Sequence, residues 1–305
     1  RMLAREAPFD PGFRCRKATV DLRAVILDLE GVWFDHGLHG TQNALRESFL
    51  SRGVELSEDE TRLVEGDPHP MDATGKVGLL RDLCQKTEDR MREAAQGATD
   101  LALPNVTAPA WVVPSLIQTF DSEYVKTVRT SKPIQNATET LKSLKEAGLK
   151  IAVIADCNEE ALEGFKLRAE YFGEGFLPDA FLSTRETSPK APQPWLVFHL
   201  MHRLGVYPAT SVVRVSSTAS GIEEGLNAGC WTVGVARTSR LVSERADADI
   251  DGSISKQLSD RIKTVYEQLY RAGAHFVIDG IWQLPKVLNE LAVYQRYSVL
   301  QLRAL

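Results

Sequence analysis

The sequence predicts an α/β protein with a doubly wound parallel sheet and a helical module inserted after the first strand. Two observations predict this fold class. From residue 133 onward, short apolar runs alternate with helical stretches of about ten to fifteen residues, which is typical of βαβ units with right-handed crossovers. Residues 40–130 carry an almost wholly helical pattern instead. The 305 residues are 43% hydrophobic, which is enough to bury a large core.

The first strand is expected within residues 24–35, which read AVILDLEGVWFD. A continuous apolar run bounded by a turn signal is typical of a buried parallel strand, and this run ends at Asp28. Open α/β sheets bind their ligands at the carboxyl ends of the strands. Asp28 is therefore the first candidate for a nucleophilic or ligand-binding group.

The helical module has recognisable starts and stops. TQNALRESFLSRG forms a helical stripe that Gly53 ends. Ser57, followed three residues later by Glu60, has the spacing of a capping box. A segment with three prolines interrupts the pattern, at Pro104, Pro109 and Pro114. Helical periodicity then resumes over residues 115–128.

The second half of the chain supplies the rest of the sheet. We expect strands at 150–156, within 176–184, and at 211–217, 230–236 and 275–281, the last as an edge strand. We expect helices at 137–147, 158–171, 194–204, 220–228 and 283–293. These elements divide the chain into an arm at 1–21, an α/β core at 22–38 and 131–293, a helical cap at 39–130 and a tail at 294–305.

Composition narrows the classes of function. A formal net charge of −5 argues against a nucleic-acid-binding surface spread over the whole protein and leaves room for a local contact. The four cysteines form no CxxC pair, which indicates neither a zinc site nor a disulfide framework and favours a reducing compartment. No apolar run approaches the ~18 residues of a membrane span.

Three strings connect the chain with a known family. They are LGVYP (204–208), EEGLNAGCWTVGV (223–235) and RAGAHFVID (271–279). Together they resemble the haloacid dehalogenase (HAD) superfamily and, within it, the phosphonoacetaldehyde hydrolases, or phosphonatases. The resemblance implies an α/β core with a helical cap and assigns the role of nucleophile to Asp28. It also places Lys76, in MDATGKVGLL, near the cap lysine that forms a Schiff base with the aldehyde in phosphonatases.

Several positions depart from the pattern that this resemblance implies. Glu30 stands where phosphonatases have a small residue, and Val32 replaces a threonine. The Ser or Thr of the second motif is missing from IAVIADCN (151–158), where apolar residues and an aspartate stand. The cation of the third motif falls on Ala191, with Lys190 one residue earlier. Each change removes or alters a group that handles the phosphorus centre in the family.

The fourth motif departs furthest. Family members carry two aspartates here that help to hold magnesium, and Ser217 and Gly221 stand in their places. Magnesium prefers charged oxygen ligands in near-octahedral geometry, so we expect its binding to be lost. Without a cation, Asp28 would attack a phosphonate dianion against a repulsion of about 4 kcal/mol per charge pair at ~4 Å.

We therefore expect a catalytically inactive phosphonatase-like protein, with Asp28, Lys76 and Lys190 as vestigial residues, that serves as a structural or interaction subunit of a larger protein assembly. Two alternatives stay open. One is an active phosphonoacetaldehyde hydrolase-like or altered HAD hydrolase that uses Asp28 and Lys76. The other is a protein that senses an anion or metabolite without turnover, through Ser217 and Thr218 at the amino end of the next helix.

The expected partners are other protein subunits, contacted through the arm at 1–21 and the tail at 294–305. The arm is basic and broken by prolines, so it cannot bury enough apolar area alone to offset its ordering entropy. An Arg-rich, acid-poor segment is also typical of organellar transit regions. A mitochondrial location is therefore the expectation, and a cytoplasmic location is the alternative.

Overall fold

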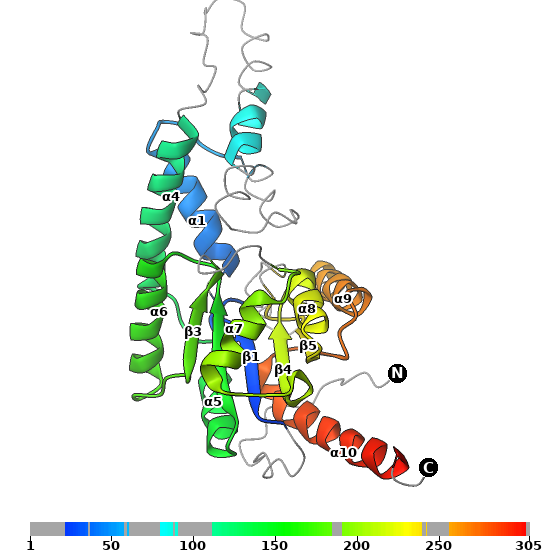
Figure 1. Cartoon of the computed structure of the whole chain (residues 1–305). Coiled ribbons are helices and arrows are strands. Elements are labelled where there is room, and N and C mark those ends of the chain that lie inside the picture. The colour runs from blue at the N-terminus through cyan, green and yellow to red at the C-terminus, as the bar shows by residue number, and fades with distance from the viewer. Residues whose placement is uncertain are drawn as a thin grey trace, which may run out of the picture.

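Parallel strands form the centre of the computed structural model of the chain (Figure 1). The structure describes residues 22–35, 37–57, 60, 80–87, 89–90, 112–184, 191–239, 242 and 256–302. Within them, a six-stranded sheet has the order β3-β2-β1-β4-β5-β6, and every neighbouring pair is parallel. This is the order of a doubly wound α/β sheet, with the reversal between β1 and β4. The predicted fold class is confirmed.

The strands occupy the apolar runs of the sequence. Their bounds are β1 Ala24–Asp28, β2 Lys150–Ala155, β3 Ala180–Ser183, β4 Val212–Ser216, β5 Trp231–Val235 and β6 Phe276–Ile278. Nearly every residue of β1, β2 and β4 is buried, as expected for strands that helices cover on both faces. β6 lies at an edge of the sheet beside β5, as predicted.

Helices cover both faces of this sheet. Their bounds are α5 Ala137–Glu146, α6 Glu159–Phe172, α7 Trp195–Leu204, α8 Ala219–Asn227, α9 Lys256–Arg271 and α10 Leu284–Leu302. Side chains of α5, α6 and α10 share one apolar cluster with the sheet. On the other face α7 packs on β2 and β3, while α8 and α9 pack beside β4, β5 and β6. Short 3-10 helices precede β4 and α10, at Ala209–Ser211 and Ile281–Gln283.

The helical part that follows β1 lies beyond the carboxyl ends of the strands. α1 (Gly37–Leu50) and α4 (Val112–Val128) pack against each other there (Figure 1). Leu80 and Leu83, from the helical residues 80–87, are buried within the same apolar cluster as β1. The predicted arm at 1–21 and the greater part of residues 58–111 lie outside the described residues.

Two details of this part bear on the sequence reading. The Ser57 backbone N–H donates to Glu60 Oε2 at 2.7 Å, and the Glu60 N–H donates to Ser57 Oγ at 3.2 Å, so the predicted capping box is confirmed. Pro114 lies inside the first turn of α4, which begins at Val112 rather than after the proline. A proline in a first turn costs no helical hydrogen bond, and this is why it does not break the helix.

Two helices near the C-terminal end differ from the prediction. No element is predicted for residues 256–271, yet α9 forms there and buries Leu258, Val265 and Leu269 along one stripe. α10 runs past the predicted end at residue 293 without a break. Within the described residues, no helix combines the length and the apolarity that a membrane span needs.

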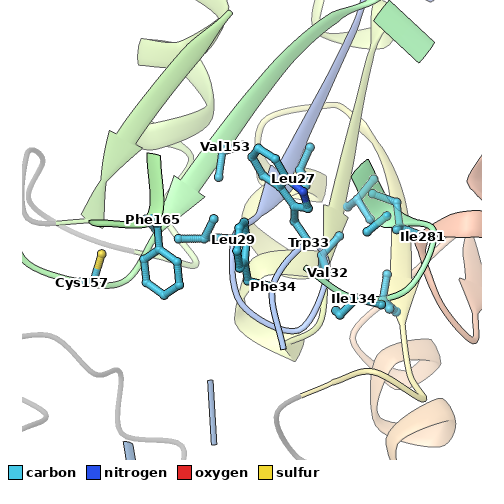
Figure 2. Close-up of a cluster of buried hydrophobic side chains, with 14 of the residues drawn as sticks. Leu27, Leu29, Val32, Trp33, Phe34, Ile134, Val153, Cys157, Phe165 and Ile281 are labelled. Atoms are coloured by element: carbon cyan, nitrogen blue, oxygen red, sulfur yellow. The ribbon is translucent and has the colours of Figure 1, made fainter. Parts of the chain in front are cut away.

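The turn after β1 is anchored in the core, which fixes the end of the strand (Figure 2). Trp33 and Phe34 are fully buried, and Trp33 Nε1 donates to Thr138 Oγ1 of α5 at 3.0 Å. The Phe34 ring lies 5.4 Å from that of Phe165 of α6 and meets it edge-on. Contacts with α5 and α6 therefore fix the backbone turn that follows Asp28.

Candidate functional site

Asp28 lies at the carboxyl end of β1, where the strand order reverses. The register of β1 against β4 pairs Leu27 with Val215, so Asp28 and Ser216 follow at the same edge of the sheet. The side chain of Asp28 is 17% exposed. In doubly wound sheets this is the position at which ligands bind.

Both carboxylate oxygens of Asp28 accept hydrogen bonds from the chain itself. Oδ1 accepts from Arg214 Nη2 at 2.6 Å in an ion pair. Oδ2 accepts from Ser216 Oγ at 2.6 Å and from the Ser217 backbone N–H at 3.1 Å. The lengths of the two shorter bonds are those of charge-assisted hydrogen bonds. Three internal donors thus hold the candidate nucleophile.

Arg214 connects Asp28 with a second acid on α8. Its Nε donates to Glu224 Oε2 at 3.1 Å, and its Nη2 lies 3.0 Å from the same oxygen. Its Nη1 donates to the Val215 carbonyl at 2.8 Å. The side chains of Arg214 and Glu224 are 2% and 1% exposed. We refer to Asp28, Arg214 and Glu224 as the buried triad.

The electrostatics of the buried triad follow from its burial. Burial raises the pKa of Glu224; Arg214 opposes this rise and the charge of Asp28 adds to it. Burial alone would lower the pKa of Arg214, but the charges of Asp28 and Glu224 raise it above the ordinary value. Arg214 therefore stays charged. Burial also raises the pKa of the neighbouring Cys230 thiol to about 12, so that thiol is not a nucleophile at neutral pH.

The start of α8 is capped from within. Thr218 is the N-cap residue, and its Oγ1 accepts from the Gly221 N–H at 3.2 Å. The Thr218 N–H itself donates to Ser216 Oγ at 3.1 Å, and the Ser217 N–H is held by Asp28. An anion bound through Ser217 and Thr218 would have to compete with these internal bonds.

Glu30 links the strand end to the helical part. Its carboxylate accepts a hydrogen bond from the hydroxyl of Tyr124, which lies on α4. Its backbone carbonyl accepts from Ser217 Oγ at 3.3 Å, and the next carbonyl, of Gly31, accepts from Thr238 Oγ1 at 2.7 Å. The residue that departs from the small side chain of the family pattern therefore ties α4 to β1.

The other candidate residues are not brought to Asp28 by any described contact. Lys76 and Lys190 lie outside the described residues. Asp156, at the end of β2, accepts from Thr184 Oγ1 at 2.7 Å. Ile154 is a buried strand residue, so it offers no hydroxyl at the second-motif position.

The residues at this strand end do not fit a magnesium ion. A Cβ built on Gly221 would lie 2.1 Å from Ser216 Oγ, so Ser216 already fills the space of an acid at that position. Ser217 offers a hydroxyl that is engaged with the Glu30 carbonyl. Across the described part of the chain, no group of three or more His, Cys, Asp or Glu side chains could hold a metal ion. Magnesium needs hard, preferably charged oxygen ligands, and among Asp28, Ser216, Ser217 and Gly221 only Asp28 supplies a charged one.

Arg214 and Glu224 are the site residues that the motif comparison does not single out. A signal for them is present in the sequence. Arg214 is the one charged residue in the otherwise apolar strand VVRVS, and a buried charge requires a partner. An acid on the helix that follows β4 is the expected partner, and Glu224 on α8 fills that role. Periodicity alone does not distinguish it from its neighbour Glu223, which is exposed.

A doubly wound sheet with a helical insertion after β1 and an acid at the end of that strand defines a Rossmann-like α/β protein whose site lies at the carboxyl ends of the strands. A family model for haloacid dehalogenase-like hydrolases matches residues 22–229, and the chain belongs to this family. The HAD recognition from sequence is confirmed.

Individual relatives are phosphonatases. The chain is 26% identical over 271 residues to a phosphonoacetaldehyde hydrolase of Bacillus cereus (strain B4264), covering 88% of this chain and 96% of the relative. It is 28% identical over 275 residues to a bifunctional phosphonoacetaldehyde hydrolase/aminoethylphosphonate transaminase of Clostridioides difficile (strain 630), covering 88% of this chain and 40% of that protein. The crystal structure of a phosphonoacetaldehyde hydrolase like protein from Oleispira antarctica superposes with a TM-score of 0.71 at 22% identity, over 96% of this chain and 97% of the other.

Proposed function

We propose that this chain is a phosphonatase-like HAD protein without turnover, which serves as a structural or interaction subunit of a larger protein assembly. The observation that carries the first half is that Arg214, Ser216 and Ser217 all donate to the two oxygens of Asp28. A nucleophilic carboxylate must present a lone pair to the phosphorus atom. Here Oδ2 accepts two internal hydrogen bonds and Oδ1 accepts one from a charged guanidinium, so these donors compete with an incoming phosphorus group for the carboxylate oxygens.

The cost of freeing the carboxylate supports this proposal. A hydrogen bond to a charged group contributes about 1.5–3 kcal/mol, and each factor of ten in rate corresponds to ~1.4 kcal/mol of barrier. Displacing Arg214 would also leave its guanidinium, which is 2% exposed, with only one carboxylate partner. Among the described residues no group of three or more His, Cys, Asp or Glu side chains could hold a metal ion, so no such ion offsets this cost, and the cation paired with Asp28 is Arg214.

The interaction role is supported by the two ends of the chain. The arm at 1–21 carries five basic residues, Arg1, Arg5, Arg14, Arg16 and Lys17. At the other end, the first part of α10 is anchored by Leu284, Leu288 and Leu291, and the helix then continues to Leu302, away from the sheet (Figure 1). We propose that these two segments contact partner subunits, in a mitochondrial setting.

Assay of the purified chain with phosphonoacetaldehyde and simple phosphate monoesters, at millimolar magnesium, tests the first half. We expect no hydrolysis above background, and we expect Asp28→Asn to complement a deletion strain as well as the wild-type chain does. Asp156→Asn, at the neighbouring strand end, is the matched control. Magnesium-dependent hydrolysis that Asp28→Asn abolishes and Asp156→Asn retains would overturn the proposal.

Native mass measurement of the endogenous protein tests the second half. We expect a high-mass complex, and we expect deletion of residues 1–20 to release the protein from it without unfolding the core. A free monomer, or full retention of the truncated chain, would contradict the proposed role of the arm.

The alternative function is a working phosphonatase-like hydrolase. The similarity to phosphonoacetaldehyde hydrolases over 88% of the chain favours it, as does the presence of Asp28 at the end of β1. In that case Asp28 would attack while Arg214, Ser216 and Ser217 hold its oxygens, or one of these bonds would open when substrate binds. The hydrolysis assay separates the two functions directly.

A further inference from the structure

We infer that the guanidinium of Arg214 is a permanent counter-ion that takes the electrostatic role of a divalent cation at the end of β1, so that the chain itself excludes a metal ion from this strand end. This inference rests on the proposed function and deepens it. It concerns what neutralises Asp28 rather than whether the protein turns over a substrate.

The strand β4 and the helix α8 together accommodate the side chain of Arg214. Arg214 stands in the middle of β4, in register with Ile26 of β1, and its side chain runs toward the carboxyl end of the sheet to reach Asp28. Gly225 of α8 makes room for it: a Cβ there would lie 2.8 Å from both Cβ and Cγ of Arg214. A larger residue at 225 would push the helix away from the strand, so Gly225 and Arg214 depend on each other.

The donors of the cluster match the oxygens that would otherwise face a cation. Arg214 donates to Asp28 Oδ1, while Ser216 Oγ and the Ser217 N–H donate to Asp28 Oδ2. Ser217 Oγ donates to the Glu30 carbonyl. An ion entering here would have to displace these donors. It would also approach the guanidinium, and like charges a few ångströms apart repel each other, most strongly where water is excluded.

Glu224 is the positioning residue for this counter-ion. Its Oε2 receives Nε and Nη2 of Arg214, which holds the planar guanidinium edge-on and directs Nη2 at Asp28. Its other oxygen, Oε1, is buried, and no donor among the described residues lies within hydrogen-bonding distance of it. Within the described part of the chain, Glu224 therefore bonds only to Arg214, which fits a role in positioning the guanidinium.

Metal binding by designed variants of the full chain tests this inference. The first variant combines Ser216→Gly, Ser217→Asp and Gly221→Asp, which restores two acids and clears the space that Ser216 fills. The second adds Arg214→Met to these three changes. Manganese binding is measured by electron paramagnetic resonance and by calorimetry. We expect no stoichiometric site in the wild-type chain, and at least about tenfold tighter binding by the second variant than by the first, because only the second lacks the repelling charge.

Equal affinity of the two variants, or binding by neither folded variant, would overturn the inference. A second measurement is made on the wild-type chain and needs a conservative variant only for assignment. The Arg214 Nε–H resonance of the wild-type chain, assigned by its loss in Arg214→Lys, should exchange slowly and should not move when millimolar magnesium is added. A shift of that resonance on addition of magnesium would also overturn the inference.

The two proposals fail in different ways. Magnesium binding by the wild-type chain without hydrolysis would remove only the counter-ion inference. Hydrolysis that needs no divalent ion would remove only the proposed loss of turnover.

Discussion

Two polar clusters lie at opposite ends of the same sheet, and they differ in how their polar groups are paired. The buried triad joins β1, β4 and α8 at the carboxyl end through full charges. At the amino end, between β5 and β6, His275 Nδ1 lies 2.7 Å from Thr232 Oγ1 and accepts from the Thr232 N–H at 3.1 Å. His275 is exposed, whereas Arg214 is 2% exposed.

The difference shows what each cluster can tolerate. In the triad the side chains of Arg214 and Glu224 are almost out of reach of water, so removal of one member leaves a buried polar group without its partner. In the Thr232–His275 pair the imidazole is neutral, because a nitrogen that accepts from a backbone N–H carries no proton. Water can replace the lost partner there. The central cluster should therefore respond strongly to mutation, and the edge cluster only weakly.

The largest expected effect is that of Arg214→Met. Removing one partner from a buried ion pair typically costs 3–5 kcal/mol, so we expect a loss of about that size in the free energy of unfolding, measured by urea denaturation. Arg203→Met is the matched control, because Arg203 is exposed and donates to the Phe181 carbonyl at 3.0 Å. The control should cost less than about 1 kcal/mol.

A second substitution sharpens the same comparison. If the loss arises from unpaired acids, adding Glu224→Gln to Arg214→Met should recover part of it, since the second variant buries one acid fewer. Strictly additive losses would show that the two residues do not act as a unit.

The contrast between the clusters also explains what could be predicted from the sequence. The core strands are continuous apolar runs because both of their faces are buried, so their positions could be predicted. The position of Asp28 at the end of β1 could be predicted from the same apolar run. The buried triad depends on a contact between residues 186 positions apart, Arg214 and Asp28, which no local pattern encodes. The hydrogen bond from Tyr124 to Glu30 is long-range for the same reason. α9 is a different case, because the apolar stripe of Leu258, Val265 and Leu269 that it buries is local and can be read from the sequence.

A smaller effect is expected where the central cluster reaches α4. Tyr124→Phe removes the hydroxyl that donates to Glu30 and leaves the ring in place beside Phe120. A hydrogen bond of this kind contributes about 1–2 kcal/mol, and we expect a loss of that size in urea denaturation. Hydrogen exchange should also become faster in Val112–Val128. Tyr171→Phe, at an exposed position of α6, is the control and should change neither quantity. An unchanged exchange rate in Tyr124→Phe would show that Glu30 does not hold α4.

The smallest effect is the pH response of the edge cluster. Partial desolvation of the imidazole lowers the pKa of His275, so below its unfolded value of about 6.5 the unfolded chain binds more protons than the folded one. The contribution of His275 to stability is therefore present above about pH 6.5 and is lost as the pH falls through the lowered folded pKa. Glu224 acts with the opposite sign: its raised pKa means that stability from this group declines as the pH rises above its unfolded value.

His275→Gln keeps an acceptor for the Thr232 N–H but does not titrate, so the difference between wild type and this variant isolates the histidine. We expect that difference, measured by denaturation between about pH 7.5 and pH 5.5, to shift against the wild type on acidification. If the difference stayed constant across this range, protonation of His275 would cost the folded chain nothing, and the edge cluster would be even more tolerant than its geometry indicates.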